Sequence, residues 1–234
     1  MAATRLVLLP GMDGTGILFG PLLEALPHGW EAQILRYPPD KALGYESLLD
    51  IVQAAIPIDG PFILLGESFS GPLALMAASK NPPGLQAVVL CASFIENPLP
   101  WLVRPFEAVI TAKTLAFAPA FVRERALLGR HATARLRSLL THAHQLVTPD
   151  AMAARARAIF RVDVSSELRA CPAPLLYIQA LDDRLVSPRS WRRIVDLRPD
   201  ACLEVVPGPH LILQTHPVEA IAAITRFCDS LNPP

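Results

Sequence analysis

Short apolar segments alternate with amphipathic ones along most of the chain, and this alternation constrains the fold more than any other feature. The apolar segments have the length of strands, and they comprise residues 5–9, 32–37, 62–65, 87–91, 174–180 and 202–206. Strands that are nearly continuous in apolar residues are typical of a parallel sheet whose two faces are both buried. The sequence therefore predicts an α/β fold with about six parallel strands flanked by helices.

The segments between the strands have the spacing of helices. These expected helices comprise residues 17–26, 45–56, 71–79, 188–197 and 217–231. A chain of 234 residues is long enough for one α/β domain with a full core, and a hydrophobic content of 52% excludes a disordered protein. In such a domain the ligand site lies at the carboxyl ends of the strands.

One long segment interrupts the alternation. Residues 97–170 contain no good strand, and they hold helical stretches rich in Ala, Leu and Arg at 102–117, 120–128, 132–144 and 149–159. Because this segment follows the fourth strand, we expect it to lie over the strand ends as a lid. The predicted organisation is a core of residues 1–96 and 171–234 with a helical lid at 97–170.

The third strand leads into a tight turn that carries a serine. The turn reads Gly66-Glu67-Ser68-Phe69-Ser70-Gly71. A G-x-S-x-G turn between a strand and a helix lifts a serine hydroxyl above the edge of a sheet. In this chain Ser70 occupies the second glycine position, and Gly71 comes one residue later. The turn predicts Ser68 as a nucleophile, with the backbone N–H of Phe69 directed at a developing oxyanion.

A serine hydroxyl is a poor nucleophile unless a base takes its proton and a third group orients that base. The fifth strand runs into a loop that contains Asp182 and Asp183, and the sixth runs into His210. The resulting order, Ser68 before the aspartates and the aspartates before His210, is the one found in G-x-S-x-G hydrolases. Glu96, after the fourth strand, is a further candidate for the acid.

These motifs resemble those of the α/β-hydrolase superfamily, in its lidded esterase and lipase-like branch. The family's acid motif is roughly G-x-x-D-x-x-V, and its register on residues 180–186 selects Asp183 over Asp182. The family's histidine motif is similar to the segment that ends at His210, ahead of a helix that Pro217 opens. The family's oxyanion loop is similar to residues 10–12, so the resemblance implies that the Met12 N–H pairs with that of Phe69.

The resemblance implies an α/β-hydrolase fold with a helical lid inserted after the fourth strand. The family's usual eight-stranded sheet opens with an antiparallel hairpin. Here the strand before the oxyanion loop begins at Arg5, which leaves no room for that hairpin. We therefore expect six parallel strands in the order 2-1-3-4-5-6.

Three polar residues lie near the predicted site, and two of them have more than one interpretation. We expect Glu67, beside the nucleophile, to point away from the catalytic pocket and to be structural. Asp13 would serve as a turn or cap residue, with substrate contact as the alternative. Ser70 would be a structural substitute for glycine, with a hydrogen bond near the site as its alternative.

The net charge is zero, but residues 97–170 hold eleven Lys and Arg against five Asp and Glu. A solvated helix face explains this excess, and so would docking of the lid onto the acidic body. The sharper alternative is an anionic partner or substrate, such as an acyl carrier protein, a coenzyme A thioester or a lipid headgroup. The arginines are Arg104, Arg123, Arg125, Arg130, Arg135, Arg137, Arg155, Arg157, Arg161 and Arg169. Apolar lid residues would line an acyl pocket or pack within the lid; the candidates are Trp101, Phe106, Phe117 and Phe121.

Other features exclude several classes of site and location. The four cysteines are far apart and show no C-x-x-C spacing, so we expect neither a metal site nor a disulfide framework, and a reducing cytoplasm fits them better. No apolar run approaches the roughly 20 residues of a membrane span, and the N-terminus lacks the pattern of a signal peptide. We expect no cofactor and no nucleic-acid partner.

The sequence as a whole predicts a cytoplasmic serine hydrolase. The expected substrate is a small carboxylic ester or thioester with an apolar acyl or alcohol part. An acyltransferase with the same triad is one alternative, and a ligand receptor or regulatory protein with slow turnover is another. The C–C hydrolases share the triad, whereas a dehalogenase is disfavoured because it would need an Asp in place of Ser68.

Overall fold

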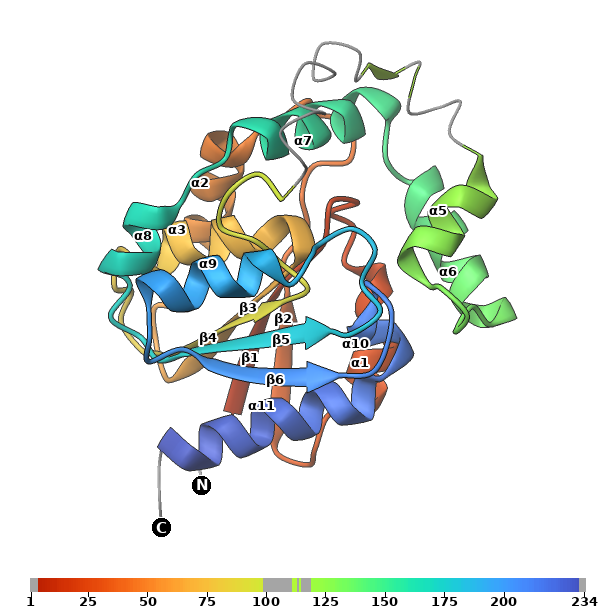
Figure 1. The fold of residues 1–234 in the computed structure, drawn as a ribbon. Helices are drawn as coiled ribbons and strands as arrows, with labels where there is room; N and C mark the ends of the chain where they lie inside the picture. The colour runs from red at the N-terminus through yellow and green to blue at the C-terminus, as the bar shows by residue number, and fades with distance from the viewer. Residues whose placement is uncertain (1–3, 99–110, 113, 115–118, 232–234) are drawn as a thin grey trace.

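The computed structural model describes residues 4–98, 111–112, 114 and 119–231 (Figure 1). Six strands form one sheet in the order β2-β1-β3-β4-β5-β6, and every neighbouring pair is parallel. The strands are β1 (Thr4–Leu9), β2 (Trp30–Ile34), β3 (Phe62–Glu67), β4 (Leu85–Cys91), β5 (Leu175–Ala180) and β6 (Cys202–Val206). The predicted number, direction and order of the strands are thus confirmed.

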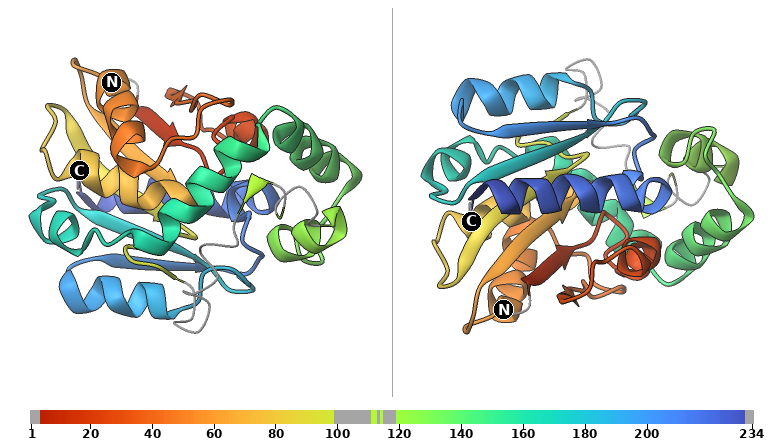
Figure 2. Two further views of the ribbon diagram at one scale, coloured as in Figure 1. Left: turned by 90° about the horizontal axis from the view of Figure 1, so that it is seen from above. Right: turned by 90° about the horizontal axis from the view of Figure 1, so that it is seen from below.

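The sheet is covered on both faces, which explains the continuous apolar strands. Helices α2 (Tyr45–Ala55), α3 (Gly71–Ala78), α8 (Ser165–Ala170) and α9 (Arg189–Leu197) pack on one face. Helices α1 (Gly20–Glu24), α10 (Ile212–Thr215) and α11 (Pro217–Leu231) pack on the other (Figure 2). Successive side chains of a strand point to opposite faces, so Val7 joins the first cluster and Leu8 the second.

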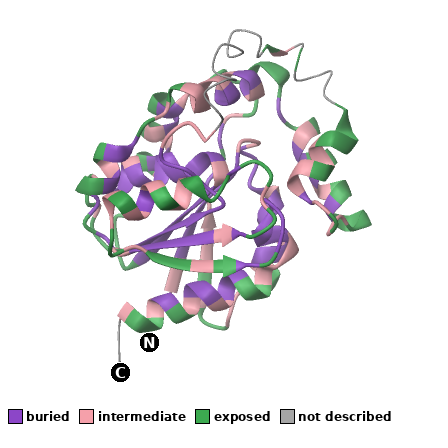
Figure 3. Cartoon of the chain, viewed as in Figure 1, coloured by how far each residue is buried: buried purple, intermediate pink, exposed green. Residues whose placement is uncertain are grey.

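Burial differs between the middle and the edge of the sheet. Strand β3 is fully buried, whereas most of β6 is exposed or only partly buried (Figure 3). Strand β2 ends at Ile34 and not at Tyr37 as predicted from the sequence. The reason is that the chain turns toward the loop after β1, where the Tyr37 N–H donates to the Gly14 carbonyl at 2.8 Å.

The segment between β4 and β5 is mainly helical in its described part. Its helices are α5 (Ala120–Leu127), α6 (Ala134–Gln145), α7 (Pro149–Arg161) and α8. Helices α5 and α6 lie beyond the carboxyl ends of the strands (Figure 1), and Leu128, Leu136 and Leu140 pack there against Leu18 and Leu211 of the core. The predicted helix at 102–117 falls almost wholly outside the described residues.

Helix α8 was not predicted from the sequence, and it packs with the core. Its Leu168 is fully buried in the cluster formed by α2, α3 and α9. The short length of α8 explains why no helical periodicity was recognised there. Within the described ranges, no helix combines the length and the apolarity that a membrane crossing requires.

Candidate active site

The turn after β3 depends on two glycines, of which Gly66 lies close to backbone atoms and Gly71 lies close to a side chain. A Cβ atom on Gly66 would lie 2.5 Å from the Ser70 carbonyl oxygen, and one on Gly71 would lie 1.8 Å from the Ser93 Oγ. Ser68, between them, has a φ of 50°, a left-handed conformation that a serine adopts only under constraint. The Ser93 hydroxyl helps to hold this conformation by donating to the Ser68 carbonyl at 2.6 Å.

Ser70 has a structural role at the position where the motif expects glycine. It is fully buried, its hydroxyl donates to the Pro10 carbonyl, and its oxygen lies 2.6 Å from the Tyr37 hydroxyl. Gly71, one residue later, is the glycine that packs closely against Ser93, just after the end of β4. The one-residue displacement of the second glycine therefore has a packing reason.

Three residues from separate strand ends meet above the sheet. The Nε2 atom of His210 lies 2.8 Å from the Ser68 Oγ, and its Nδ1 lies 2.8 Å from an Asp183 oxygen. The side chains of His210 and Asp183 are each only 3% exposed. The other Asp183 oxygen accepts the backbone N–H groups of Leu185 and Val186 at 2.8 and 2.9 Å, which fixes the carboxylate toward the imidazole.

The other acid and histidine candidates lie elsewhere. Asp182 is exposed, with Arg130 at 3.9 Å, and Glu96 pairs with Arg193 at 3.4 Å. The ring of His216 packs edge-on against His131 at 4.8 Å between ring centroids. Among the residues that the structure describes, no group of three or more His, Cys, Asp or Glu side chains could hold a metal ion.

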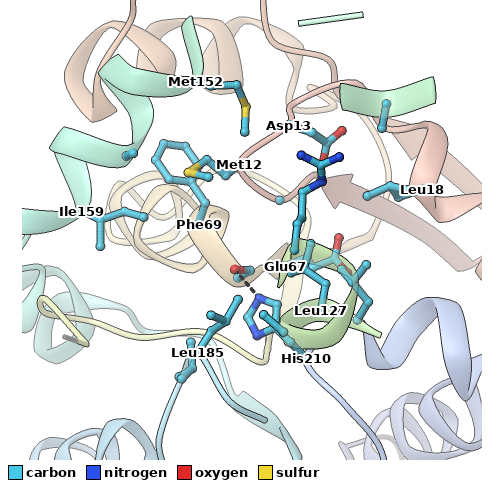
Figure 4. A pocket seen from close by; sticks show the side chains of 18 of the residues that line it. Met12, Asp13, Leu18, Glu67, Phe69, Leu127, Met152, Ile159, Leu185 and His210 are labelled. Atoms are coloured by element: carbon cyan, nitrogen blue, oxygen red, sulfur yellow. Dashed lines mark hydrogen bonds between the residues drawn. The ribbon is translucent and has the colours of Figure 1, made fainter. Parts of the chain in front are cut away.

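The loop after β1 faces the Ser68 turn. Met12 and Phe69, the two predicted oxyanion donors, both line the cavity above Ser68 (Figure 4). A turn closes the loop, because the Gly14 N–H donates to the Gly11 carbonyl at 3.0 Å. Phe69 lies in a short 3-10 helix at Ser68–Ser70, so its amide is close to the start of a helical segment.

Arg155 of α7 holds this loop from the side of the inserted segment. Its guanidinium donates to the carbonyls of Met12 (3.0 Å), Asp13 (2.7 Å) and Pro38 (2.8 Å), and it lies over the Tyr37 ring. Arg155 is 0% exposed, and burial lowers its pKa. A solvated helix face is therefore the wrong interpretation for this arginine. Sequence reasoning missed its role because its three acceptors are backbone carbonyls, which leave no sequence signature.

Two other arginines of the segment contact acidic residues of the core. Arg135 forms an ion pair with Glu24, and Arg130 faces Asp182. Docking of the basic segment onto the core, one of the explanations considered for the charge excess, thus accounts for part of it. Arg125 is exposed.

An apolar cavity of about 410 Å³ opens above Ser68 and His210. Its apolar lining comes from the segment between β4 and β5 and from the loops at the sheet edge: Leu18, Phe94, Pro98, Ala126, Leu127, Leu140, Ala143, Met152, Ala156, Ile159, Phe160, Leu185, Val186 and Leu211. Figure 4 shows Met152 and Ile159 of α7 on the side of Met12 and Phe69, with Leu185 beside His210. A cavity with such a lining suits an apolar chain.

The predicted lid aromatics do not contribute to the described lining. Phe121 is 70% exposed and is not among the lining residues. Trp101, Phe106 and Phe117 lie outside the described residues. Phe160 of α7 is the aromatic side chain that the described part of α6 and α7 adds to the lining, and it was not singled out from the sequence. The other apolar lining residues from α6 and α7 are aliphatic or methionine, and sequence alone does not separate them from ordinary helix packing.

Glu67 does not point away from the pocket, contrary to expectation. Its carboxyl lines the cavity, is 2% exposed, and accepts a hydrogen bond from the Gln214 side chain at 2.8 Å. Burial raises the pKa of Glu67 to about 7. Asp13 also lines the cavity, and Thr15 donates to it through its N–H and its hydroxyl, as expected of a turn residue. Burial raises the pKa of Asp13 as well.

Comparison with known families agrees with this arrangement. A model of the alpha/beta hydrolase family matches residues 6–224. The chain belongs to the alpha/beta hydrolase family. Among solved structures, this α/β-hydrolase superposes with a TM-score of 0.83 on a hydrolase from Oleispira antarctica, at 15% identity over 98% of this chain and 92% of that one. That likeness concerns the fold.

Curated relatives of this α/β-hydrolase include enzymes that act on esters. It is 28% identical to a pimeloyl-[acyl-carrier protein] methyl ester esterase of Stenotrophomonas maltophilia, over 97% of this chain and 94% of that enzyme. It is 35% identical to phytyl ester synthase 1 of Arabidopsis thaliana over 117 residues. That match spans 46% of this chain and only 16% of the plant protein. The family model and the curated relatives identify this protein as a hydrolase.

Proposed function

We propose that this α/β-hydrolase is a serine esterase that cleaves a carboxylic ester with an apolar acyl or alcohol part. The single observation that carries the proposal is the position of His210, within 2.8 Å of both the Ser68 Oγ and an Asp183 oxygen. A hydroxyl, an imidazole and a carboxylate at these distances are the requirements for nucleophilic attack by serine. The apolar lining above Ser68 supports the apolar part of the substrate.

In the proposed first step, His210 takes the Ser68 proton as the serine oxygen attacks the ester carbonyl. The N–H groups of Met12 and Phe69 stabilise the negative charge that develops on the carbonyl oxygen. Asp183 stabilises the imidazolium and keeps its Nε2 toward the serine. The imidazolium then gives its proton to the alcohol oxygen, the carbon–oxygen bond breaks, and an acyl-enzyme remains on Ser68.

In the second step, His210 takes a proton from water, and the water oxygen attacks the acyl carbonyl. The imidazolium returns the proton to the Ser68 oxygen as the acid leaves. Every proton in this cycle passes through His210, and no cofactor enters it. Within residues 97–170, the part that precedes α8 acts in this proposal as a lid over the site. We also propose a cytoplasmic location, which the four free cysteines support.

The test is hydrolysis of p-nitrophenyl esters of increasing chain length. We expect activity on medium acyl chains that fit the cavity, and a loss of about a thousandfold or more in Ser68→Ala. Ser166→Ala, an exposed serine in α8, is the matched control and should retain wild-type activity. Undiminished hydrolysis by Ser68→Ala would exclude the proposed mechanism.

An acyltransferase is the second candidate function. It is favoured by the match to phytyl ester synthase 1, because the same acyl-enzyme can react with an alcohol instead of water. Product analysis with an acceptor alcohol distinguishes the two: the transferase forms a new ester in preference to the free acid. Turnover far below about 1 s⁻¹ on every ester tried would favour the receptor or regulatory alternative.

The relation to a pimeloyl-[acyl-carrier protein] methyl ester esterase makes an acyl carrier protein a further candidate partner. Arg130 and Arg137, which are exposed in the inserted segment, would attract its acidic surface. Activity on a carrier-linked ester should then fall as salt rises, whereas activity on a small ester should change little. Equal salt dependence on both substrates would count against electrostatic docking.

A further inference from the structure

A cationic side chain lines the apolar cavity, and none of the carboxylates that the structure describes is paired with it. Arg123 of α5 lines the cavity, and its Nε atom is buried without a hydrogen-bond partner. Within the described part of the chain, no carboxylate forms an ion pair with its guanidinium. Burial of a charged donor without an acceptor is unfavourable, so an anion bound there would be stabilised.

A second basic group lies beside Arg123. His144 of α6 lines the same cavity, and its pKa is lowered by burial and by the positive charge of Arg123. The two groups come from helices of the inserted segment, whereas Ser68 and His210 come from the edge of the sheet. The two cavity carboxyls accept hydrogen bonds from other residues, Glu67 from Gln214 and Asp13 from Thr15, and neither forms an ion pair with Arg123.

We propose that Arg123 binds a carboxylate carried on the acyl chain, so that the preferred substrate is a half-ester of a dicarboxylic acid. The inference rests on the proposed esterase function and names the substrate class of that site. The acyl part stays bonded to Ser68 until the second step ends, and Ser68 and Arg123 line the same cavity, so we assign this cavity to the acyl chain. A guanidinium offers a carboxylate two parallel hydrogen bonds, and Leu127 and Leu140 line the cavity for the methylenes between the two ends.

The test compares two ester series of equal chain length. One contains mono-p-nitrophenyl esters of dicarboxylic acids from adipate upward, since shorter half-esters cyclise with their own carboxylate. The other contains p-nitrophenyl alkanoates. The measured quantity is the ratio of kcat/KM for the half-ester to kcat/KM for the alkanoate. We expect Arg123→Gln to lower this ratio about 10- to 100-fold, and Arg123→Lys to lower it less.

Arg125→Gln is the matched control, because Arg125 is exposed on the same helix and is not among the lining residues. It should leave the ratio unchanged. An unchanged ratio in Arg123→Gln, with hydrolysis that still requires Ser68, overturns the carboxylate site and leaves the esterase proposal intact. Absence of Ser68-dependent hydrolysis on both series overturns the esterase proposal instead.

Binding provides a readout that does not depend on turnover. In the Ser68→Ala background, calorimetry should detect the binding of monomethyl adipate. Adding Arg123→Gln should weaken this binding about 10- to 100-fold. Arg123→Lys repeats the comparison if the glutamine variant fails to fold. Equal affinity with and without the Arg123 guanidinium would overturn the proposed site.

Discussion

The Nη1 atom of Arg155 donates a hydrogen bond to the Met12 carbonyl oxygen at 3.0 Å, across 143 positions of sequence. Through this bond, helix α7 of the inserted segment fixes the loop whose Met12 N–H is the proposed oxyanion donor. The same guanidinium holds the next carbonyl, that of Asp13, so two successive peptide groups are oriented together. We infer that Arg155 is a positioning residue for the oxyanion site.

Replacement of Arg155 should therefore affect the chemical step. In Arg155→Lys one ammonium nitrogen replaces the two guanidinium nitrogens that now reach the three carbonyls, so it cannot reproduce their geometry, and the loop loses its fixed orientation. We expect kcat on a p-nitrophenyl ester to fall about 10-fold or more, with a smaller change in KM. Arg125→Lys, at an exposed position of α5, is the control. A change confined to KM would contradict the positioning role.

Restoring the motif glycine at position 70 should destabilise the protein. In Ser70→Gly the Pro10 carbonyl and the Tyr37 hydroxyl both lose a buried partner. We expect a loss of about 1–3 kcal/mol in the free energy of unfolding, measured by urea denaturation. Tyr37→Phe should cost less in the Ser70→Gly background than in the wild type. A glycine variant as stable as the wild type would show that these bonds contribute nothing.

Gly71 should not tolerate a side chain. The added methyl of Gly71→Ala would overlap Ser93, and backbone or strand movement would be needed to relieve it. We expect a destabilisation of about 2–4 kcal/mol in thermal or urea unfolding. Gly20→Ala is the control, because no atom lies within 4 Å of a Cβ there, and it should change stability little. Similar effects at both positions would contradict the packing argument.

Glu67 should make stability depend on pH. Its pKa is about 7 in the fold and about 4.5 in the unfolded chain, so between these values the fold retains a proton that the unfolded chain releases. Ionisation then favours unfolding, and stability falls as pH rises through this range. Glu67→Gln removes the effect, and a reoriented Gln214 amide can offer its unpartnered oxygen to the new amide.

The measurement is the difference in unfolding free energy between Glu67→Gln and the wild type at several pH values. Between pH 4 and pH 8, this difference should change by about 3 kcal/mol in favour of the variant. A difference that is the same at pH 4 and pH 8 would show that Glu67 does not retain its proton in the fold.

The sheet could be predicted from the sequence because its cause is local. Apolar runs such as the one ending at Gly66 are buried on both faces, and parallel strands bring their carboxyl ends to one edge. That rule placed Ser68, Asp183 and His210 together before any contact was known. The end of strand β2 differs from the predicted one, because the hydrogen bond from Tyr37 to Gly14 joins segments that are distant in sequence.

The surroundings of the triad could not be predicted in the same way. Arg155 reaches backbone carbonyls, and Glu67 reaches Gln214 across 147 positions, so neither contact has a spacing that a sequence reveals. Phe121 has an apolar aromatic side chain that would suit a pocket, yet this side chain is exposed. Composition shows that a segment is basic and apolar, but only packing decides which of its side chains enter the cavity.

The most direct test of the proposed nucleophile is to identify the residue that an alkyl p-nitrophenyl phosphonate labels. We expect release of one equivalent of p-nitrophenol, a mass increase on the peptide that contains Ser68, no labelling of Ser68→Ala, and much slower labelling of His210→Ala. Labelling of a different residue, or labelling of Ser68→Ala at the wild-type rate, would contradict the central claim that Ser68 is the nucleophile.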